Sequence, residues 1–189
     1  MPTLFVVAGP NGCGKSTLTR TTWFSRIEVV DPDAIASRRS SATPLQAARQ
    51  AVRRRRTAIR SGLTAAVETT LAGHDALRLI QSARTAGYRI ELHHVCLHSP
   101  ELALDRIRNR VALGGHDVPQ PDVRRRFVRS LAHLPAAIER SDESRLYDNS
   151  DPSRPHREVA VLSFDRLWTA ERLPDWAAAA IAGTASQCR

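Results

Sequence analysis

Short apolar runs alternate along the chain with longer amphipathic stretches. Four runs rich in β-branched and other apolar residues predict strands at residues 3–8, 27–30, 64–67 and 89–97. Two shorter strands are predicted near residues 146–147 and at 158–162. Helical periodicity and end signals predict helices at residues 15–24, 44–61, 74–86, 100–113 and about 121–134, with a last helix from about 174. Alternating strands and helices are typical of an α/β fold, so we expect a doubly wound, mostly parallel sheet with helices on both faces.

The first predicted strand runs directly into a glycine-rich motif. Residues 9–17 read GPNGCGKST, a complete G-x-x-x-x-G-K-[ST] phosphate-binding pattern between a strand and a helix. Its glycines let the loop wrap an anion with its backbone N–H groups, and the following helix start faces the same anion. The nucleotide-binding residues predicted from the motif are Gly9, Pro10, Asn11, Gly12, Cys13, Gly14, Lys15, Ser16 and Thr17.

Two of these side chains have specific expected roles. Lys15 should reach the β- and γ-phosphates, and the hydroxyl of Ser16 should ligate Mg²⁺. Cys13 is either a small filler or a thiol whose pKa a helix start could lower. The motif therefore predicts a P-loop NTPase-type fold.

The composition makes the lysine more informative. The chain carries 28 basic and 19 acidic residues, a formal net charge of +9, and only one of the 28 is lysine, so 27 are arginine. That one lysine is Lys15. A compact ammonium and a planar guanidinium fork are not interchangeable, so its position indicates a site that requires an ammonium.

Length and patterning set the expected class and location. The 189 residues, 42% hydrophobic and 25% charged, predict one globular domain over residues 1–189. No run approaches the ~18 apolar residues of a membrane helix, and no basic segment precedes the apolar run at residues 4–8. Cys13, Cys96 and Cys188 are odd in number and far apart, which does not indicate a disulfide framework or a metal site. We expect a cytoplasmic protein with no membrane partner.

Acidic and hydroxyl side chains follow the next two predicted strands. Asp31 and Asp33 follow the strand at residues 27–30, and Glu68 and Thr70 follow the strand at residues 64–67. Ligands of such sheets bind at the carboxyl ends of the strands, where a carboxylate could accept the proton of an acceptor hydroxyl. Asp33 could instead cap a helix, Asp31 precedes a proline and fits a turn, and Glu68 could be a buried structural carboxylate.

An arginine-rich segment at about residues 106–130 is the predicted lid. Gly114 and Gly115 form a possible hinge between two predicted helices. Arginines on a mobile lid can neutralise charge on a transferring phosphoryl group and exclude water. Most of these arginines should be solvated, and we expect two of them to be functional. The candidates are Arg106, Arg108, Arg110, Arg124, Arg125, Arg126 and Arg129.

Five segments together resemble the zeta-toxin-like P-loop kinases. They are GPNGCGKST, VDPDAIA, VETTLAG, RVALGGHDVPQPDVRRRFVRSLAHLP and YDNS, and they cover residues 3–150 in the order of the family. The sequence is most similar to the chromosomal branch of that family, often labelled as predicted ABC-type ATPases.

The resemblance implies an ATP- and Mg²⁺-dependent kinase that phosphorylates the amino-sugar 3′-hydroxyl of UDP-N-acetylglucosamine, and a possible antitoxin partner that blocks the nucleotide site. By position, it implies phosphate-loop roles for Lys15 and Ser16, a general-base role for Asp33, and substrate binding by Glu68 and Thr70. Arg110 and Arg126 best match the lid arginines, with Arg106, Arg108 and Arg125 as close rivals.

Three other readings remain open on the sequence. A motor or ABC-type ATPase is disfavoured because no LSGGQ-like signature and no apolar strand ending in an Asp-Glu pair occurs. A kinase of another metabolite or of a nucleic-acid end is possible, although aromatic residues are only 5% and the arginines are spread over several helices, which makes nucleic acid unlikely. A nucleotide-gated binding protein without turnover would not need the acceptor-side acids Asp33 and Glu68.

Replacing Asp33 separates catalysis from helix capping. If Asp33 orients the acceptor hydroxyl and takes its proton, Asp33→Asn should lower kcat ~10²- to 10⁴-fold with near-normal ATP affinity. Asparagine caps helices about as well as aspartate, so a capping residue would tolerate this change. Steady-state kinetics and calorimetry with ATP measure both quantities, and full activity of the variant would reject the catalytic role.

Overall fold

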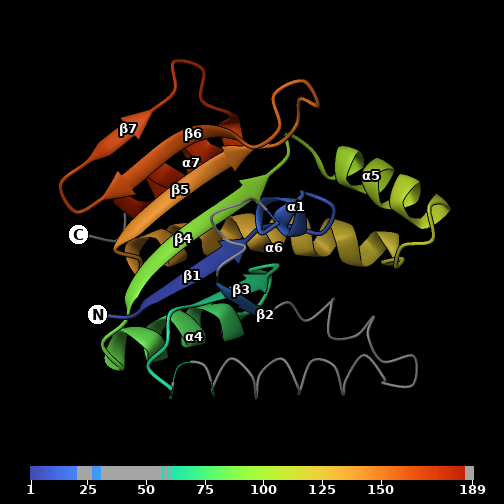
Figure 1. Cartoon of the computed structure of the whole chain (residues 1–189). Helices are drawn as coiled ribbons and strands as arrows, with labels where there is room; N and C mark the ends of the chain where they lie inside the picture. Colours follow the sequence, from blue (N-terminus) through green and yellow to red (C-terminus); the bar gives the residue numbers. More distant parts are fainter. Residues whose placement is uncertain (21–26, 31–56, 58, 60, 186–189) are drawn as a thin grey trace.

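The computed structural model describes residues 1–20, 27–30, 57, 59 and 61–185, and the statements below concern these residues. Its strands form one seven-stranded sheet in the order β2-β3-β1-β4-β5-β6-β7 (Figure 1). The bounds are β1 (Thr3–Ala8), β2 (Glu28–Val30), β3 (Ala65–Thr69), β4 (Arg89–Cys96), β5 (Glu143–Asp148), β6 (Arg157–Ser163) and β7 (Leu167–Thr169). Strands β1 to β5 pair in parallel, and β6 and β7 are added antiparallel. The predicted mostly parallel α/β sheet is confirmed.

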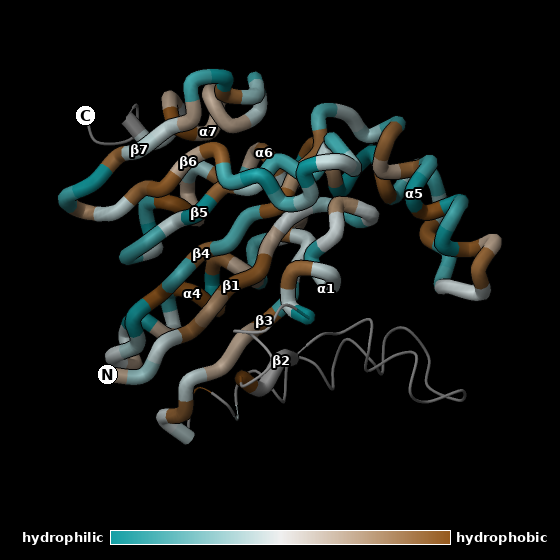
Figure 2. Tube along the Cα trace, turned by 45° about the horizontal axis from the view of Figure 1, so that its top comes forward, coloured by the Kyte–Doolittle hydropathy of each residue, from teal (hydrophilic) through white to brown (hydrophobic). Residues whose placement is uncertain are grey.

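Strand β1 lies in the middle of the sheet because its residues are apolar on both faces. Val6 pairs in register with Val67 of β3 and Leu92 of β4, and all three side chains are buried. Near-continuous apolar runs are typical of parallel strands that are covered on both faces. In Figure 2 these hydrophobic segments run through the centre of the molecule, whereas α5 alternates between hydrophobic and hydrophilic positions. The carboxyl end of β1 therefore delivers the phosphate loop to the middle of one sheet edge.

The described helices are α1 (Lys15–Leu18), α4 (His74–Thr85), α5 (Pro100–Ala112), α6 (Gln120–Glu139) and α7 (Asp175–Ala185). Helix α6 contacts α4, α5 and α7, and α6 and α7 lie behind the sheet in Figure 1. Helix α5 begins as its sequence predicts, because the hydroxyl of Ser99 accepts a hydrogen bond from Leu102 N at 3.3 Å and Pro100 occupies the first turn. None of the described helices has the length and apolarity needed to cross a bilayer.

Helix α6 is longer than the predicted helix at residues 121–134. Pro135 lies inside it, although proline in a helix interior removes a hydrogen bond and usually ends the helix. Beyond the proline, Ala137 and Ile138 are buried in the core. On the outer side, Pro135 lies so close to α7 that a Cβ atom at Gly183 would be 2.8 Å from its ring. Tertiary burial thus outweighs the local cost of the proline.

The structure adds one strand to the prediction, and some of the predicted elements lie outside the described residues. Strand β7 was not predicted, since its three residues are all exposed and lack an apolar alternation. Most of the helix predicted at residues 44–61, the second half of that predicted at 15–24, and the acids Asp31 and Asp33 lie outside the described residues. Their roles stay predictions.

A fully buried histidine lies between β4 and the helical layer. His94 Nε2 lies 3.3 Å from the hydroxyl of Ser130 on α6, and its ring packs at 5.7 Å against Trp176 of α7. Burial, and to a lesser extent the charge of Lys15, lower the pKa of His94 from 6.5 to about 3. Because desolvation disfavours the charged ring, the histidine is neutral in the folded protein.

The pH dependence of stability should report this histidine. Between the two pKa values the unfolded chain binds a proton at His94 that the folded chain does not, so the free energy of unfolding falls as pH falls. The expected contribution is about 1.4 kcal/mol per pH unit below about pH 6.5. Urea denaturation of the wild type and of His94→Gln, from about pH 7 to about pH 4, should show a shallower slope for the variant. His98→Gln, at an exposed position, is the control and should keep the wild-type slope; equal slopes for all three proteins would contradict the assignment.

Candidate functional site

The phosphate loop connects β1 to α1 and approaches its neighbours so closely that a side chain is excluded at each of its three glycines, most severely at Gly9 and Gly14. Gly9 has φ 137° and Gly14 has φ 100°, conformations that residues with a Cβ rarely adopt. A Cβ atom at Gly9 would overlap the carbonyl oxygen of Val95 on β4, and one at Gly14 would overlap the amide of Asn149. The two invariant glycines of the motif are therefore required by tertiary neighbours as well as by the turn.

The side chain of Lys15, the first residue of α1, turns back to the phosphate loop that precedes it. Lys15 Nζ donates a hydrogen bond to the carbonyl oxygen of Pro10 at 2.9 Å. This hydrogen bond holds the ammonium against the loop, and its other two N–H donors can bind an anion. Cys13 in the same loop is fully buried, and burial raises the pKa of its thiol despite the opposing charge of Lys15. A raised pKa fits a small filler and does not fit a reactive thiolate.

A buried carboxylate sits beside the hydroxyl expected to ligate Mg²⁺. Glu68, at the end of β3 and only 3% exposed, accepts hydrogen bonds from Ser16 Oγ at 2.9 Å and Thr19 Oγ1 at 2.6 Å. Carboxylate and hydroxyl oxygens are the ligands that Mg²⁺ prefers, so this pair suits a magnesium ion next to the phosphate loop. The substrate-binding role expected for Glu68 stays a prediction, and Thr70 is half-buried and not among the residues that line the cavity described next.

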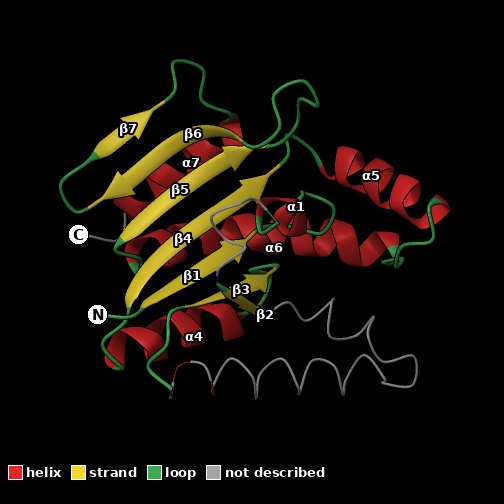
Figure 3. Ribbon diagram, in the orientation of Figure 1, coloured by secondary structure: helices red, strands yellow, loops and turns green. Residues whose placement is uncertain are grey.

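A cavity of about 370 Å³ opens above the loop. Its lining includes residues of α1 and α5, and both helices lie beyond the carboxyl ends of β1 and β4 in Figure 3. Four cationic side chains and one carboxylate line the cavity, so its electrostatics favour an anion. The lining residues are Asn11, Gly12, Gly14, Lys15, Ser16, Thr17, Arg20, Glu68, Arg106, Ile107, Arg110 and Asn149.

The structure separates the arginines of the predicted lid into two groups. Arg106 and Arg110, one helical turn apart on α5, both line the cavity, and Arg126 of α6 donates to Asn11 Oδ1 in the phosphate loop at 3.3 Å. Three of the other four form ion pairs on the surface, Arg108 with Asp105, Arg124 with Glu101, and Arg125 with Asp122, and the fourth, Arg129, is exposed. Exposed pairs of this kind contribute little to stability, and they occupy guanidinium groups that were rivals for a site role.

The two glycines of the predicted hinge end α5. Gly114 has φ 83°, and Gly115 N donates to the carbonyl oxygen of Arg110 at 2.9 Å. The guanidinium of Arg110 in turn donates to the carbonyl oxygen of His116 at 2.6 Å. This loop therefore fixes the position of Arg110, and hinge motion at Gly114 and Gly115 stays a prediction.

Sequence reasoning did not assign a role to Asn149 or His156, which lie on the loop between β5 and β6. Asn149 Nδ2 donates to the carbonyl oxygen of Cys13 at 2.8 Å, and His156 Nε2 lies 3.0 Å from the carbonyl oxygen of Gly14. The available signal was the YDNS segment, in which a polar residue follows a strand at the site edge of the sheet. No local pattern connects position 156 to the phosphate loop, more than 140 residues earlier.

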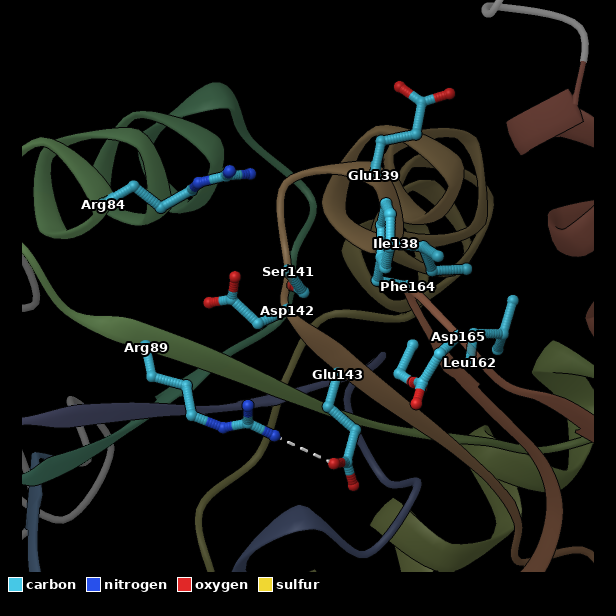
Figure 4. Close-up of a pocket in the computed structure, with 11 residues that line it drawn as sticks. Arg84, Arg89, Ile138, Glu139, Ser141, Asp142, Glu143, Leu162, Phe164 and Asp165 are labelled. Carbon is cyan, nitrogen blue, oxygen red and sulfur yellow. Dashed lines mark hydrogen bonds and ion pairs between the residues drawn. The ribbon is translucent and has the colours of Figure 1, made fainter. Parts of the chain in front are cut away.

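A larger concavity, about 600 Å³, lies at the opposite end of the sheet (Figure 4). It is bordered by the ends of α4 and α6, the start of β5 and the turn between β6 and β7. Its charged groups include Arg89, which pairs with Glu143 at 3.0 Å, and Asp142, which accepts a hydrogen bond from Ile90 N at 2.7 Å. These charges hold the amino ends of β4 and β5 together, and the phosphate loop contributes none of the lining.

A central parallel strand, a G-x-x-x-x-G-K-S loop and a serine paired with a buried carboxylate define a P-loop kinase-like fold. The sequence pattern of the AAA domain family matches residues 4–133, and the chain belongs to that family. An uncharacterized protein of Haemophilus influenzae is 30% identical over 123 residues, which cover 63% of this chain and 88% of that protein.

Solved structures share the fold. A chain of the AvrRxo1-ORF1:-ORF2 complex with ATP superposes with a TM-score of 0.72 and 20% identity, covering 97% of this chain and 64% of that one. A chain from the PezAT chromosomal toxin-antitoxin system of Streptococcus pneumoniae superposes with a TM-score of 0.66 and 15% identity, covering all of this chain and 86% of that one. This protein thus spans somewhat less than two thirds of the AvrRxo1 complex chain. The expected resemblance to zeta-toxin-like P-loop kinases is confirmed at the level of the fold, and the family shown is the AAA domain family.

Substitution of single arginines should separate site residues from surface residues. If Arg110 and Arg126 stabilise the developing phosphoryl charge, Arg110→Ala and Arg126→Ala should each lower kcat by ~10²-fold or more. Arg124→Ala is the matched control on α6, since its guanidinium pairs with Glu101 at the surface. Phosphoryl transfer kinetics measure the effect. Small and equal losses for the three variants would show that these arginines form a solvated face.

Proposed function

We propose that the protein is an ATP-dependent kinase that transfers a phosphoryl group to a hydroxyl of a small molecule. The observation that carries the proposal is that Lys15, Ser16, Glu68, Arg106 and Arg110 line one cavity at the phosphate loop, while Arg126 contacts Asn11 of the same loop. Phosphoryl transfer depends almost entirely on positioning and on electrostatic stabilisation, and this arrangement supplies both.

Each group has a role that follows from its contacts. Lys15 and the N–H groups of the loop bind the β- and γ-phosphates of ATP. Ser16 and Glu68 would hold Mg²⁺, which when bound neutralises phosphate charge. Arg106, Arg110 and Arg126 stabilise the negative charge that spreads over the transferring group.

The acceptor side of the proposal rests on the resemblance to zeta-toxin-like kinases. The preferred acceptor is a sugar hydroxyl of a nucleotide sugar such as UDP-N-acetylglucosamine, with Asp33 as the general base and Glu68 and Thr70 on the substrate side. A cytoplasmic location and an antitoxin partner belong to the same proposal. The Streptococcus pneumoniae structure comes from a toxin-antitoxin system, which supports the search for such a partner.

A substrate panel tests the proposal directly. Wild-type protein, ATP and Mg²⁺ are incubated with nucleotide sugars, free sugars and nucleic-acid 5′ ends, and transfer of labelled phosphate is measured. We expect transfer to a nucleotide sugar. Transfer to a nucleic-acid end alone would show that the acceptor is a nucleic acid and not a nucleotide sugar. ATP binding without transfer to any acceptor would favour a nucleotide-gated binding protein.

Lys15 variants provide the internal control of that assay. Lys15→Ala should abolish transfer and weaken ATP binding, because it removes the cation from the phosphates. Lys15→Arg should also fail, since a planar fork does not fit where a compact ammonium sits across the loop. Calorimetry with ATP and Mg²⁺ reads the binding, and unchanged affinity in Lys15→Ala would overturn the phosphate-site assignment.

A further inference from the structure

Asn149 connects the end of β5 to three other parts of the fold. The residue is 5% exposed, and all four of its polar groups are used. Its backbone N–H donates to the carbonyl oxygen of Cys96 at 2.9 Å, and its backbone carbonyl oxygen accepts from the guanidinium of Arg106 at 2.6 Å. Its side-chain amide donates to the carbonyl oxygen of Cys13 at 2.8 Å and accepts from His156 N at 3.0 Å.

His156 makes the adjacent contact with the loop. A carbonyl oxygen can only accept, so the ring nitrogen that lies 3.0 Å from Gly14 O must carry the proton. The backbone of His156 is left-handed, with φ 52°, which is uncommon for a residue with a side chain. That conformation brings its N–H to Asn149 while its ring reaches Gly14. A strained backbone of this kind persists when surrounding contacts determine it.

These two donors act on carbonyl groups, and peptide geometry transmits their effect to the N–H groups of the loop. In a planar trans peptide, the C=O of one residue and the N–H of the next point in opposite directions. A donor that fixes the carbonyl of Cys13 therefore fixes the N–H of Gly14 on the opposite side. The carbonyl oxygen of Gly14 also accepts hydrogen bonds from Thr17 N and Leu18 N of α1, both at 3.1 Å. The ring of His156 adds a third donor to this carbonyl, which lies opposite the N–H of Lys15. Both N–H groups belong to the stretch of the loop that lines the cavity.

We propose that Asn149 and His156 are positioning residues of the phosphate site, which orient the N–H groups of Gly14 and Lys15 toward the bound triphosphate. The inference rests on the proposed nucleotide-binding function of the loop. It adds that the β5–β6 loop sets phosphate affinity through its hydrogen bonds to the backbone of the phosphate loop. Since Arg106 donates to the backbone of Asn149, the same residue also fixes the position of one cavity arginine.

The test uses isosteric and donor-retaining substitutions. Asn149→Asp keeps the acceptor for His156 N but replaces the donor to Cys13 with a carboxylate oxygen. His156→Leu removes the donor to Gly14 O, and His156→Gln restores an N–H at a similar reach. Gln81→Glu, an exposed amide-to-carboxylate change on α4, is the matched control for Asn149→Asp. Calorimetry gives the dissociation constant for ATP with Mg²⁺, kinetics give kcat and KM, and thermal unfolding without nucleotide gives Tm.

We expect His156→Leu to weaken ATP binding ~5- to 10-fold, the size of one lost hydrogen bond, and Asn149→Asp to weaken it more, because it adds like charge beside the anion. His156→Gln and Gln81→Glu should bind as the wild type does. The loss should appear in KM for ATP more than in kcat, with little change in the Tm of the nucleotide-free His156 variants.

The outcomes distinguish the inference from the function on which it rests. If wild-type protein does not bind ATP, the proposed function fails. If it binds and His156→Leu binds equally well, or if leucine and glutamine weaken binding equally, the positioning role is overturned while the function stands. Should Asn149→Asp fail to fold, the comparison of leucine with glutamine at position 156 still decides the question.

Discussion

The close packing of the phosphate loop against its neighbours is the constraint on which the site depends. The backbone at Gly9 lies against Val95 of β4, and the backbone at Gly14 lies against Asn149 at the end of β5. Close-packed contacts of this kind leave no space for a side chain and little freedom for the backbone. The loop conformation is thereby determined by two strands of the sheet, which brings its N–H groups into position before any ligand binds.

The charges around the loop also depend on contacts with neighbouring elements. The loop side of the cavity carries Lys15 together with the arginines of α5, and its one buried carboxylate, Glu68, is held by two hydroxyl groups. Burial of a charge is unfavourable unless the charge is hydrogen-bonded, and the hydroxyls of Ser16 and Thr19 supply these hydrogen bonds to Glu68. Three arginines of the predicted lid, Arg108, Arg124 and Arg125, pair with acids on the surface and do not line the cavity.

The strands and the motif were predictable because their determinants are local. The apolar run of β1, the glycine pattern that follows it and the Ser99-Pro100 start of α5 each depend on residues close together in sequence. The extension of α6 past Pro135 and the exposed strand β7 were not predictable. In α6, burial of residues from distant elements outweighs a local helix breaker, and β7 is a strand only because β6 lies beside it.

For the site, the sequence by itself determined which loop carries the phosphate-binding motif, which lysine belongs to it, and that arginines at about residues 106–130 are candidates. The tertiary structure decided which of them reach the loop: Arg126 contacts Asn11, whereas its neighbours Arg124 and Arg125 pair with surface acids. Only the tertiary structure placed Glu68 against Ser16, and Asn149 and His156 against the loop. The physical reason is that these contacts join residues 52 to 142 positions apart. Helical spacing shows which residues share a face of a helix, but it does not show which neighbouring element that face contacts.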